Sequence, residues 1–451
     1  MKMVKFLALV LTFVMVIGLL AACTGNNNNA SNSEAESNTQ KPANTSNTDT
    51  KKEEPAAETD TGKIEGKLTV WTFFGQVEDM AKKFMEKYPD VTVEVKVFPG
   101  DQYQTKLLTA LASRQGAPDI FDLERGYIGK FINAPFAEDM SAMGAEELLK
   151  DYVPYVQELG RDKEGTIRAI SDHSSPGGFI YIRENALKWL GTDDPDQISA
   201  MVDSWDKVID LGKKIANDSK GEVHLISNAG DLFDIEGYNM DPWTHDGALV
   251  LDPRWEGIYE TQLRIRNEGV DAKLGFFSGG WGNAINDGSV ILTAMPAWAG
   301  FMIDNKEDKA VGKFGVAKTP SGYYMGGTYR SIYSESPNKE LAYEFVKYIA
   351  SPEWQEHNLG ATGNTPGSLK VYEDNMEMHT GNFYGDQKIL KPYYELMKSI
   401  PPHRANEYDE DVFGKFKKAA SNGINNNLPY SEVVAAFKKD VGNAFRDLKV
   451  E

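Results

Sequence analysis

Residues 67–98, KLTVWTFFGQVEDMAKKFMEKYPDVTVEVKVF, hold the pattern that decides the fold. The stretch opens with KLTVWTFF (67–74), a short β-branched and aromatic run that indicates a buried strand. Apolar residues then recur at the spacing of an amphipathic helix over 77–85, and VTVEVKVF (91–98) alternates as a strand does. The stretch therefore predicts a strand, a helix and a second strand.

The same alternation continues along the chain. Leu107, Leu108 and Leu111 predict another helix, and APDIFDLE (117–124) a third strand. Strands that alternate with helices imply right-handed crossovers and a parallel sheet. Ligands of open α/β sheets bind at the carboxyl ends of the strands, here near residues 73–76 and 123–127.

A second α/β set begins near GFIYIREN (178–185). Ser204 is placed as the N-cap of the helix SWDKVIDLGKKIA. Beyond it we expect a helix over 253–267, the strand SVILTAM (289–295), strand-like stretches at 312–320 and 326–333, and a helix over 338–350. The part from about residue 63 to 451 is long enough for two lobes.

The first 22 residues have the order of a secretory signal: two lysines, an apolar run, then two alanines. A membrane-spanning helix is the alternative, but the run is near the short end of what spans a bilayer. The tetrad Leu20-Ala21-Ala22-Cys23 resembles the lipobox of bacterial lipoproteins, which implies lipidation of Cys23, the only cysteine. Residues 24–62 lack large apolar side chains, so we expect a disordered linker with an end-to-end distance of roughly 35 Å.

Composition excludes some functions. The formal net charge of −19 argues against nucleic acid as a partner, although solubility alone can explain it. No phosphate loop, dinucleotide turn, zincin pair or nucleophile elbow occurs, so we predict no cofactor, no metal and no catalytic residue. A pair of carboxylates would nevertheless suffice for glycoside hydrolysis. The run DDPD (193–196) is interpreted as a solvated turn before a helix rather than a cation site.

Several segments, taken in order, resemble one family: lipid-anchored extracellular solute-binding proteins of bacterial ABC importers, in the carbohydrate-binding group. The resemblance covers nearly all of the folded part, and no single segment is specific by itself. The segments that carry it are KLTVWTFF and YPDVTVEV, YQTKLLTALASRQGAPDIFDLE, IRAISDHSSPGGFIYIREN, SWDKVIDLGKKIA, DGSVILTAMPAWAGF, KFGVAKTP with YYMGGTYRSIY, and NKELAYEFVKYIASPEWQ.

The resemblance implies a two-lobed α/β fold of the type II periplasmic-binding-protein kind, with parallel or mixed sheets and the ligand in a cleft that closes by a hinge motion. It places a signal peptide at 1–22, a lipidated N-terminus and linker at 23–64, lobe one at 65–172 plus 317–365, and lobe two at 173–316 plus 366–451. The implied partners are a carbohydrate, the permease subunits of an ABC importer and, through Cys23, the outer face of the cell membrane. We expect a monomer.

A sugar receptor needs aromatic platforms and fixed polar groups. Trp298 in MPAWAGF matches the family's pocket tryptophan, with core packing as the alternative. Glu124 and Arg125 follow a strand end, and a mutual surface ion pair is an equal alternative for them. Trp205, Trp255, Trp189 and Trp354 are expected in the core. The complete predicted site consists of Phe74, Gln76, Glu124, Arg125, Tyr127, Asp172, His173, Trp243, Trp281, Trp298, Gly327, Tyr329, Arg330 and Tyr408.

The favoured function is therefore a receptor without catalysis that captures an oligosaccharide outside the cell and delivers it to a permease. Two alternatives remain open. One is a lipid-anchored polysaccharide hydrolase or lyase, and the other is the same receptor fold with a non-sugar solute, such as a peptide or an organic anion.

Overall fold

A computed structural model describes residues 63–237, 239–302, 312–378 and 382–450. The predicted signal peptide, Cys23 and the linker as far as residue 62 lie outside the described residues. The chain divides into two units, residues 1–61 and residues 62–451, and all described elements belong to the second.

The first sheet has four strands in the order β10-β3-β1-β2, and we call this sheet with its helices the first lobe. Its strands are β1 (Gly66–Thr72), β2 (Val91–Val97), β3 (Ile120–Glu124) and β10 (Thr328–Ile332). β1 runs parallel to β2 and β3, as the sequence predicts, whereas β10 pairs antiparallel with β3. Along β1 the buried residues are Leu68, Val70 and Thr72, so burial follows the two-residue period of a strand.

The second sheet also has four strands, in the order β5-β8-β4-β9, and with its helices it forms the second lobe. Its strands are β4 (Gly177–Ile182), β5 (His224–Ile226), β8 (Val290–Pro296) and β9 (Phe314–Ala317). β4 pairs antiparallel with both β8 and β9, and β5 runs parallel to β8. β4 and β8 are buried along their whole length, because helices cover both faces of the sheet. A separate small hairpin pairs β6 (Thr244–His245) with β7 (Ala248–Leu249).

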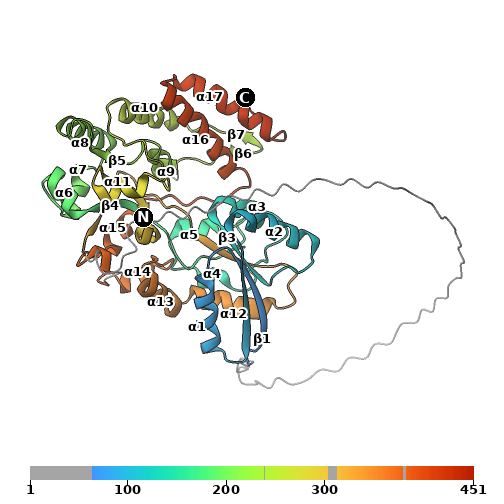
Figure 1. Cartoon of the computed structure of the whole chain (residues 1–451). Helices are drawn as coiled ribbons and strands as arrows, with labels where there is room; N and C mark the ends of the chain where they lie inside the picture. Colours follow the sequence, from blue (N-terminus) through green and yellow to red (C-terminus); the bar gives the residue numbers. More distant parts are fainter. Residues whose placement is uncertain (1–62, 238, 303–311, 379–381, 451) are drawn as a thin grey trace, which may run out of the picture. The chain divides into compact units, whose positions relative to one another are not determined.

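Helices cover both sheets (Figure 1). Before β4, and between β10 and residue 375, they are α1 (Val77–Lys87), α2 (Gly100–Ser113), η1 (Arg125–Tyr127), α3 (Ile128–Ile132), α4 (Ala145–Leu148), α5 (Pro154–Leu159), α12 (Lys339–Ala350), α13 (Pro352–Thr362) and α14 (Leu369–Asp374). The others are α6 (Arg183–Leu190), α7 (Pro195–Met201), α8 (Trp205–Asp218), α9 (Asp231–Gly237), α10 (Arg254–Asn267), α11 (Trp281–Asp287), η2 (Ala297–Met302), η3 (Asn382–Tyr384), α15 (Leu390–Met397), α16 (Asp409–Asn426) and α17 (Tyr430–Ala444).

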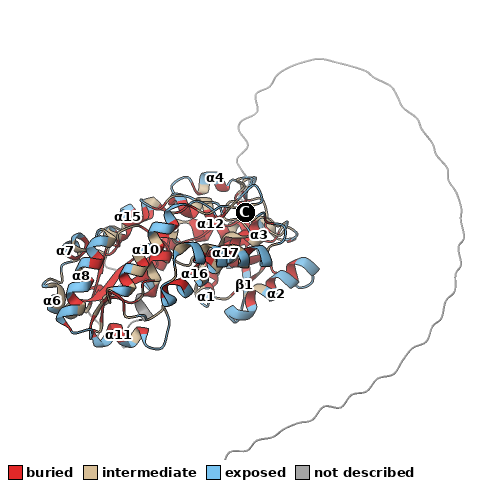
Figure 2. Cartoon of the chain, turned by 90° about the horizontal axis from the view of Figure 1, so that it is seen from above, coloured by how far each residue is buried: buried red, intermediate tan, exposed pale blue. Residues whose placement is uncertain are grey.

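Local sequence explains where several helices begin. The Ser204 hydroxyl accepts a hydrogen bond from the Lys207 backbone N–H at 3.4 Å and caps α8, as predicted. Asp194 caps α7 in the same way, by accepting from the N–H groups of Asp196 and Gln197. Figure 2 shows the buried residues gathered in the strands and on the inner faces of the helices, with exposed residues on the outer faces of helices such as α2, α6 and α8.

Three segments run side by side between the two sheets. β-bridges join Ile170 to Arg330, His173 to Pro366, and Pro176 to Tyr324. The chain therefore crosses from one sheet to the other around residues 170–176, 324–330 and 365–367. Polar groups on these crossings are therefore placed to contact a ligand that binds between the two sheets.

Candidate functional site

The largest cavity described here has a volume of about 770 Å³ and a mostly apolar wall. That volume falls within the usual range for sites that hold small molecules. Residues from both lobes and from the crossings line it: Phe73, Phe74, Gln76, Glu124, His173, Ala297, Trp298, Gly326, Gly327, Thr328, Gly360, Ala361, Thr362, Gly363, Asn364, Phe383, Tyr384 and Ile389. We call this cavity the cleft.

The first-lobe wall is built at the carboxyl ends of strands. Phe73, Phe74 and Gln76 follow β1, and Glu124 ends β3. Phe74 is 40% exposed, which is unusual for a large apolar side chain and leaves its ring available to a ligand. Gly327 precedes β10 with φ of +121°, a conformation that other residues rarely adopt, so the backbone itself forms part of the wall.

The second-lobe wall contains Trp298, which lies in η2 just after β8. The indole N–H of Trp298 donates to the Met325 carbonyl oxygen at 2.9 Å, so the crossing segment fixes the ring's orientation. Phe383, Tyr384 and Ile389 complete this wall. With Phe73 and Phe74, the cleft therefore presents aromatic rings from both lobes, an arrangement suited to the flat C–H faces of sugar rings.

Sequence reasoning missed two lining segments. Residues 360–364 lie at and just beyond the end of α13, and Phe383, Tyr384 and Ile389 lie further along the chain. Neither segment follows a predicted strand end, the criterion that selected Phe74, Gln76 and Glu124. The glycine and asparagine content of GATGNT (360–365) indicates a turn and nothing about its position.

Glu124 is the one carboxylate on the described wall of the cleft. Its Oε2 accepts from the Gly126 backbone N–H at 2.6 Å, while Oε1 accepts no hydrogen bond from the residues that the structure describes. Burial raises the pKa of the Glu124 carboxyl, and the neighbouring Arg125 opposes this only in part. The second oxygen is therefore left for a hydroxyl of a bound molecule.

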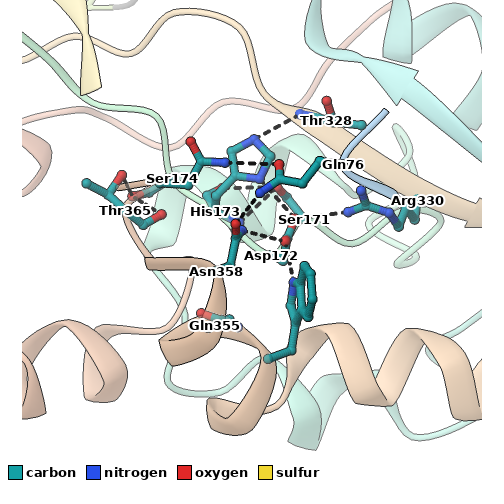
Figure 3. A network of polar contacts seen from close by, with 12 residues as sticks. Gln76, Ser171, Asp172, His173, Ser174, Thr328, Arg330, Gln355, Asn358 and Thr365 are labelled. Carbon is teal, nitrogen blue, oxygen red and sulfur yellow. Dashed lines mark hydrogen bonds and ion pairs between the residues drawn. The ribbon is translucent and has the colours of Figure 1, made fainter. Parts of the chain in front are cut away.

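Beneath the cleft, Asp172 gathers four donors (Figure 3). Oδ1 accepts from Arg330 Nη1 at 2.9 Å and lies 2.9 Å from His173 Nδ1. Oδ2 accepts from Trp354 Nε1 at 2.6 Å and from Asn358 Nδ2 at 3.1 Å. Because His173 Nε2 accepts from the Thr328 N–H, we assign the ring proton to Nδ1, which then donates to Asp172.

The network extends from Asp172 both to the cleft and to the first sheet. Asn358 accepts from the Gln76 side chain, which lines the cleft. Arg330 Nε lies 3.2 Å from Asp122 Oδ1, and Asp122 also accepts from the Thr72 hydroxyl at 2.7 Å. The network thus joins β1, β3, β10, α13 and the first crossing through a continuous set of buried contacts.

Opposing effects act on the two buried carboxyl groups. Burial raises the pKa of Asp172, but the charge of Arg330 and the hydrogen bonds that the carboxylate accepts from His173 and Trp354 outweigh it, so this pKa lies well below its ordinary value. For Asp122 burial prevails over the attraction to Arg330, and the pKa is raised. Asp172 is therefore the firmly ionised partner of Arg330.

A second, smaller cavity of about 90 Å³ lies where residues 403–413 meet η1, α3 and α9. Arg125 and Trp243, both predicted site residues, line this cavity and not the cleft. Arg125 pairs with Glu410 at 3.1 Å, and its guanidinium lies 5.4 Å from the centre of the Tyr324 ring. Arg125 thus pairs with a carboxylate from the other end of the chain, whereas the alternative considered for it was an ion pair with Glu124.

The cleft brings together six of the predicted residues: Phe74, Gln76, Glu124, His173, Trp298 and Gly327. Asp172, Tyr329 and Arg330 are buried and line neither cavity. Their charges and hydroxyls are used within the protein, as in the bond from the Tyr329 hydroxyl to the Val156 carbonyl oxygen.

Other aromatic candidates pack against protein instead. Trp243 stacks on Trp255 with 5.2 Å between ring centres, and Trp281 packs edge-on against Phe276 at 4.8 Å. Tyr127 packs edge-on against Phe131, and the Tyr408 hydroxyl donates to Asp447 at 2.5 Å. Their flanking glycine, proline and acidic residues indicate turns, but a turn can direct an aromatic ring into the core as readily as into a cleft.

Other kinds of site find no support in the described part of the chain. None of its helices combines the length and apolar character that a membrane span needs. Among the same residues, no three His, Cys, Asp or Glu side chains gather closely enough to hold a metal ion. At residues 193–196, Asp194 serves as a helix cap, in line with the interpretation of this run as a turn.

Two α/β lobes, joined by three crossings and enclosing an aromatic cleft, define a receptor for a small molecule. The sequence profile of the bacterial extracellular solute-binding proteins matches residues 74–356, and the chain belongs to that family. The predicted fold class is thereby confirmed, because the similar solved structures are two-lobed binding proteins as well.

Similar proteins support the same assignment. The arabinooligosaccharide-binding protein of Halalkalibacterium halodurans is 25% identical over 399 residues, which cover 78% of this chain and 85% of the relative. The lactose-binding protein of Rhizobium radiobacter is 23% identical and covers 79% and 89%. The sugar-binding protein MalE of Xanthomonas citri has the same fold, with a TM-score of 0.70 at 14% identity over 83% of this chain and 96% of its own.

Proposed function

We propose that this protein captures an oligosaccharide in the cleft and delivers it to the permease of an ABC importer. The observation that carries the proposal is the cleft itself: five aromatic side chains from two lobes, together with the Glu124 carboxylate, line a cavity of about 770 Å³. Flat aromatic surfaces bind the C–H faces of sugars, and a carboxylate accepts from their hydroxyls.

Two relatives support a carbohydrate as the solute, since their names specify an arabinooligosaccharide and lactose. The proposal includes the predicted contacts of Phe74, Gln76, Glu124, His173, Trp298 and Gly327 with the ligand. It also includes the lobe division at residues 65–172 plus 317–365 and 173–316 plus 366–451. Closure on the ligand requires that the closed state bind it more tightly than the open state.

The experiment is calorimetric titration of the purified protein against arabino-oligosaccharides, lactose, galactobiose, maltotriose and a panel of peptides. We expect heat from at least one oligosaccharide, with one ligand bound per chain, and none from the peptides. Binding of a peptide with no response to any sugar would contradict the proposed solute class.

The alternative of a polysaccharide hydrolase or lyase is not favoured, because the relatives and the family are binding proteins. Incubation of the protein with the bound oligosaccharide distinguishes the two functions. The receptor returns the sugar intact after hours, whereas a hydrolase or lyase yields shorter products that chromatography separates.

We further propose that the chain is a monomer anchored to the outer face of the cell membrane. The support is the signal-like leader, with Cys23 at the end of a lipobox and a polar linker behind it. Mass spectrometry of the membrane-derived protein tests this: a diacylglycerol on Cys23 as the first residue is expected, and an unmodified cysteine or a retained leader would refute it.

A further inference from the structure

The charges around the cleft point to a selectivity that neither the fold nor the relatives define. Among the described residues, the wall of the cleft holds the Glu124 carboxylate and no lysine or arginine. His173 also lines this wall, and its two ring nitrogens are held by Asp172 and by the Thr328 N–H. A negative group on a ligand would therefore meet no opposite charge on this wall.

The charges behind the wall do not change this balance. Arg125, next to Glu124, lies in the smaller cavity and pairs with Glu410. Arg330, below the cleft, is shared between the buried carboxyl groups of Asp122 and Asp172. With both carboxyl groups ionised this group of three is negative, and with Asp122 protonated it is neutral, so neither state attracts an anion.

We propose that the cleft selects uncharged oligosaccharides and excludes acidic ones, and that Glu124 is the residue that enforces this selectivity. The inference rests on the proposed function and narrows it to a substrate class. Neutral hydroxyls can donate to the open Glu124 oxygen, whereas a uronate would place a second carboxylate beside it in a partly dry, aromatic pocket. An ionised group left unpaired there would keep the ligand out.

The test compares one sugar in three forms: the tightest-binding neutral oligosaccharide of the panel, the same sugar with one primary hydroxyl oxidised to a carboxylate, and the amide of that carboxylate. The amide matches the size of the carboxylate but carries no charge. At about 0.15 M salt we expect the wild type to bind the amide roughly 30-fold or more tightly than the carboxylate.

Two variants test whether Glu124 causes the preference for the amide over the carboxylate. Glu124→Gln keeps an oxygen for the Gly126 N–H while removing the charge, and it should reduce the preference for the amide about tenfold or more. Glu340→Gln removes an exposed carboxylate on α12, outside the cleft, and should leave the preference unchanged.

The possible results distinguish a failure of the proposed selectivity from a failure of the proposed oligosaccharide binding. Equal or tighter binding of the carboxylate by the wild type overturns the selectivity while leaving a sugar receptor in place. An unchanged preference in Glu124→Gln overturns the role of Glu124, and because the wild-type comparison does not depend on that variant, a misfolded variant would not remove the test. Absence of binding by every neutral oligosaccharide overturns the proposed function and the selectivity together.

Discussion

Asp172→Asn tests whether the buried network holds the crossings together. The carboxylate accepts from Arg330, His173, Trp354 and Asn358 at 2.6–3.1 Å, and its side chain is 2% exposed. Asparagine keeps the shape but has a single acceptor oxygen, so some of the four donors would face an N–H group. Breaking a buried ion pair in this way costs about 3–5 kcal/mol of the free energy of unfolding.

The assay is thermal unfolding followed by circular dichroism. For a unit of about 390 residues the unfolding entropy is roughly 0.8 kcal/mol/K, so the midpoint should fall by about 4–6 °C. The control Asp90→Asn removes a carboxylate that is 56% exposed and pairs with Lys63, and it should change the free energy by less than about 1 kcal/mol. A midpoint for Asp172→Asn within about 1 °C of the wild type would refute the reasoning.

The same substitution has a pH signature. Because the folded pKa of Asp172 lies below the value in the unfolded chain, its contribution to stability is present above about pH 4 and is lost as the pH falls. The variant should therefore approach the wild type in stability toward acid pH, as urea titrations at pH 3, 5 and 7 would show. A constant difference between the two proteins at all three values would contradict this cause.

Three further predictions concern other parts of the structure. Burial raises the pKa of Asp409 to about 6, so the stability that its protonated carboxyl gives the fold is present below about pH 4 and is lost as the pH rises through 6. Between pH 4 and pH 7 the free energy of unfolding of Asp409→Asn, measured with urea, should therefore gain about 1–2 kcal/mol over that of the wild type. No gain would refute the burial argument. Gly177→Ala would bring a Cβ to 2.0 Å from the Tyr323 ring, so its free energy of unfolding in the same assay should fall by about 1–3 kcal/mol. The control Gly257→Ala, on the exposed face of α10, should raise the free energy of unfolding by about 0.5–1 kcal/mol. Equal stability of the two variants would contradict the close contact. Trp298→Ala should weaken oligosaccharide binding by roughly 10- to 100-fold in calorimetry without loss of fold, and Trp189→Ala on α6 should not weaken it; unchanged affinity in Trp298→Ala would remove that ring from the site.

The first sheet could be predicted because its signals are local. β1, α1 and β2 lie within residues 66–97, each with the periodicity of its element, and parallel pairing follows from the helical crossovers. The antiparallel strand β10 could not be placed in the same way. It pairs with β3 across about 200 residues of chain, and the resemblance to a family, rather than any local pattern, assigned it to the first lobe.

The site was predictable where a ligand contact follows a strand end, as for Phe74, Glu124 and Trp298. Elsewhere the same residue type can either contact a ligand or stabilise the interior of the protein, and the local sequence does not distinguish the two roles. The residues that flank Asp172 and Arg330 in the sequence do not reveal that these two side chains form an ion pair beneath the cleft. Trp243 has the same turn-like flanking residues as Trp298, but it packs on Trp255. Burial decides between these roles, and it depends on which distant segments the fold brings into contact.

We expect the cleft to hold an intact oligosaccharide. Native mass spectrometry of the protein purified from its own host, without refolding, tests it most directly. We predict one added mass per chain that equals a whole number of pentose or hexose residues, and a marked loss of that mass in Trp298→Ala. A bound peptide, or a sugar recovered only as shortened products, would contradict the account.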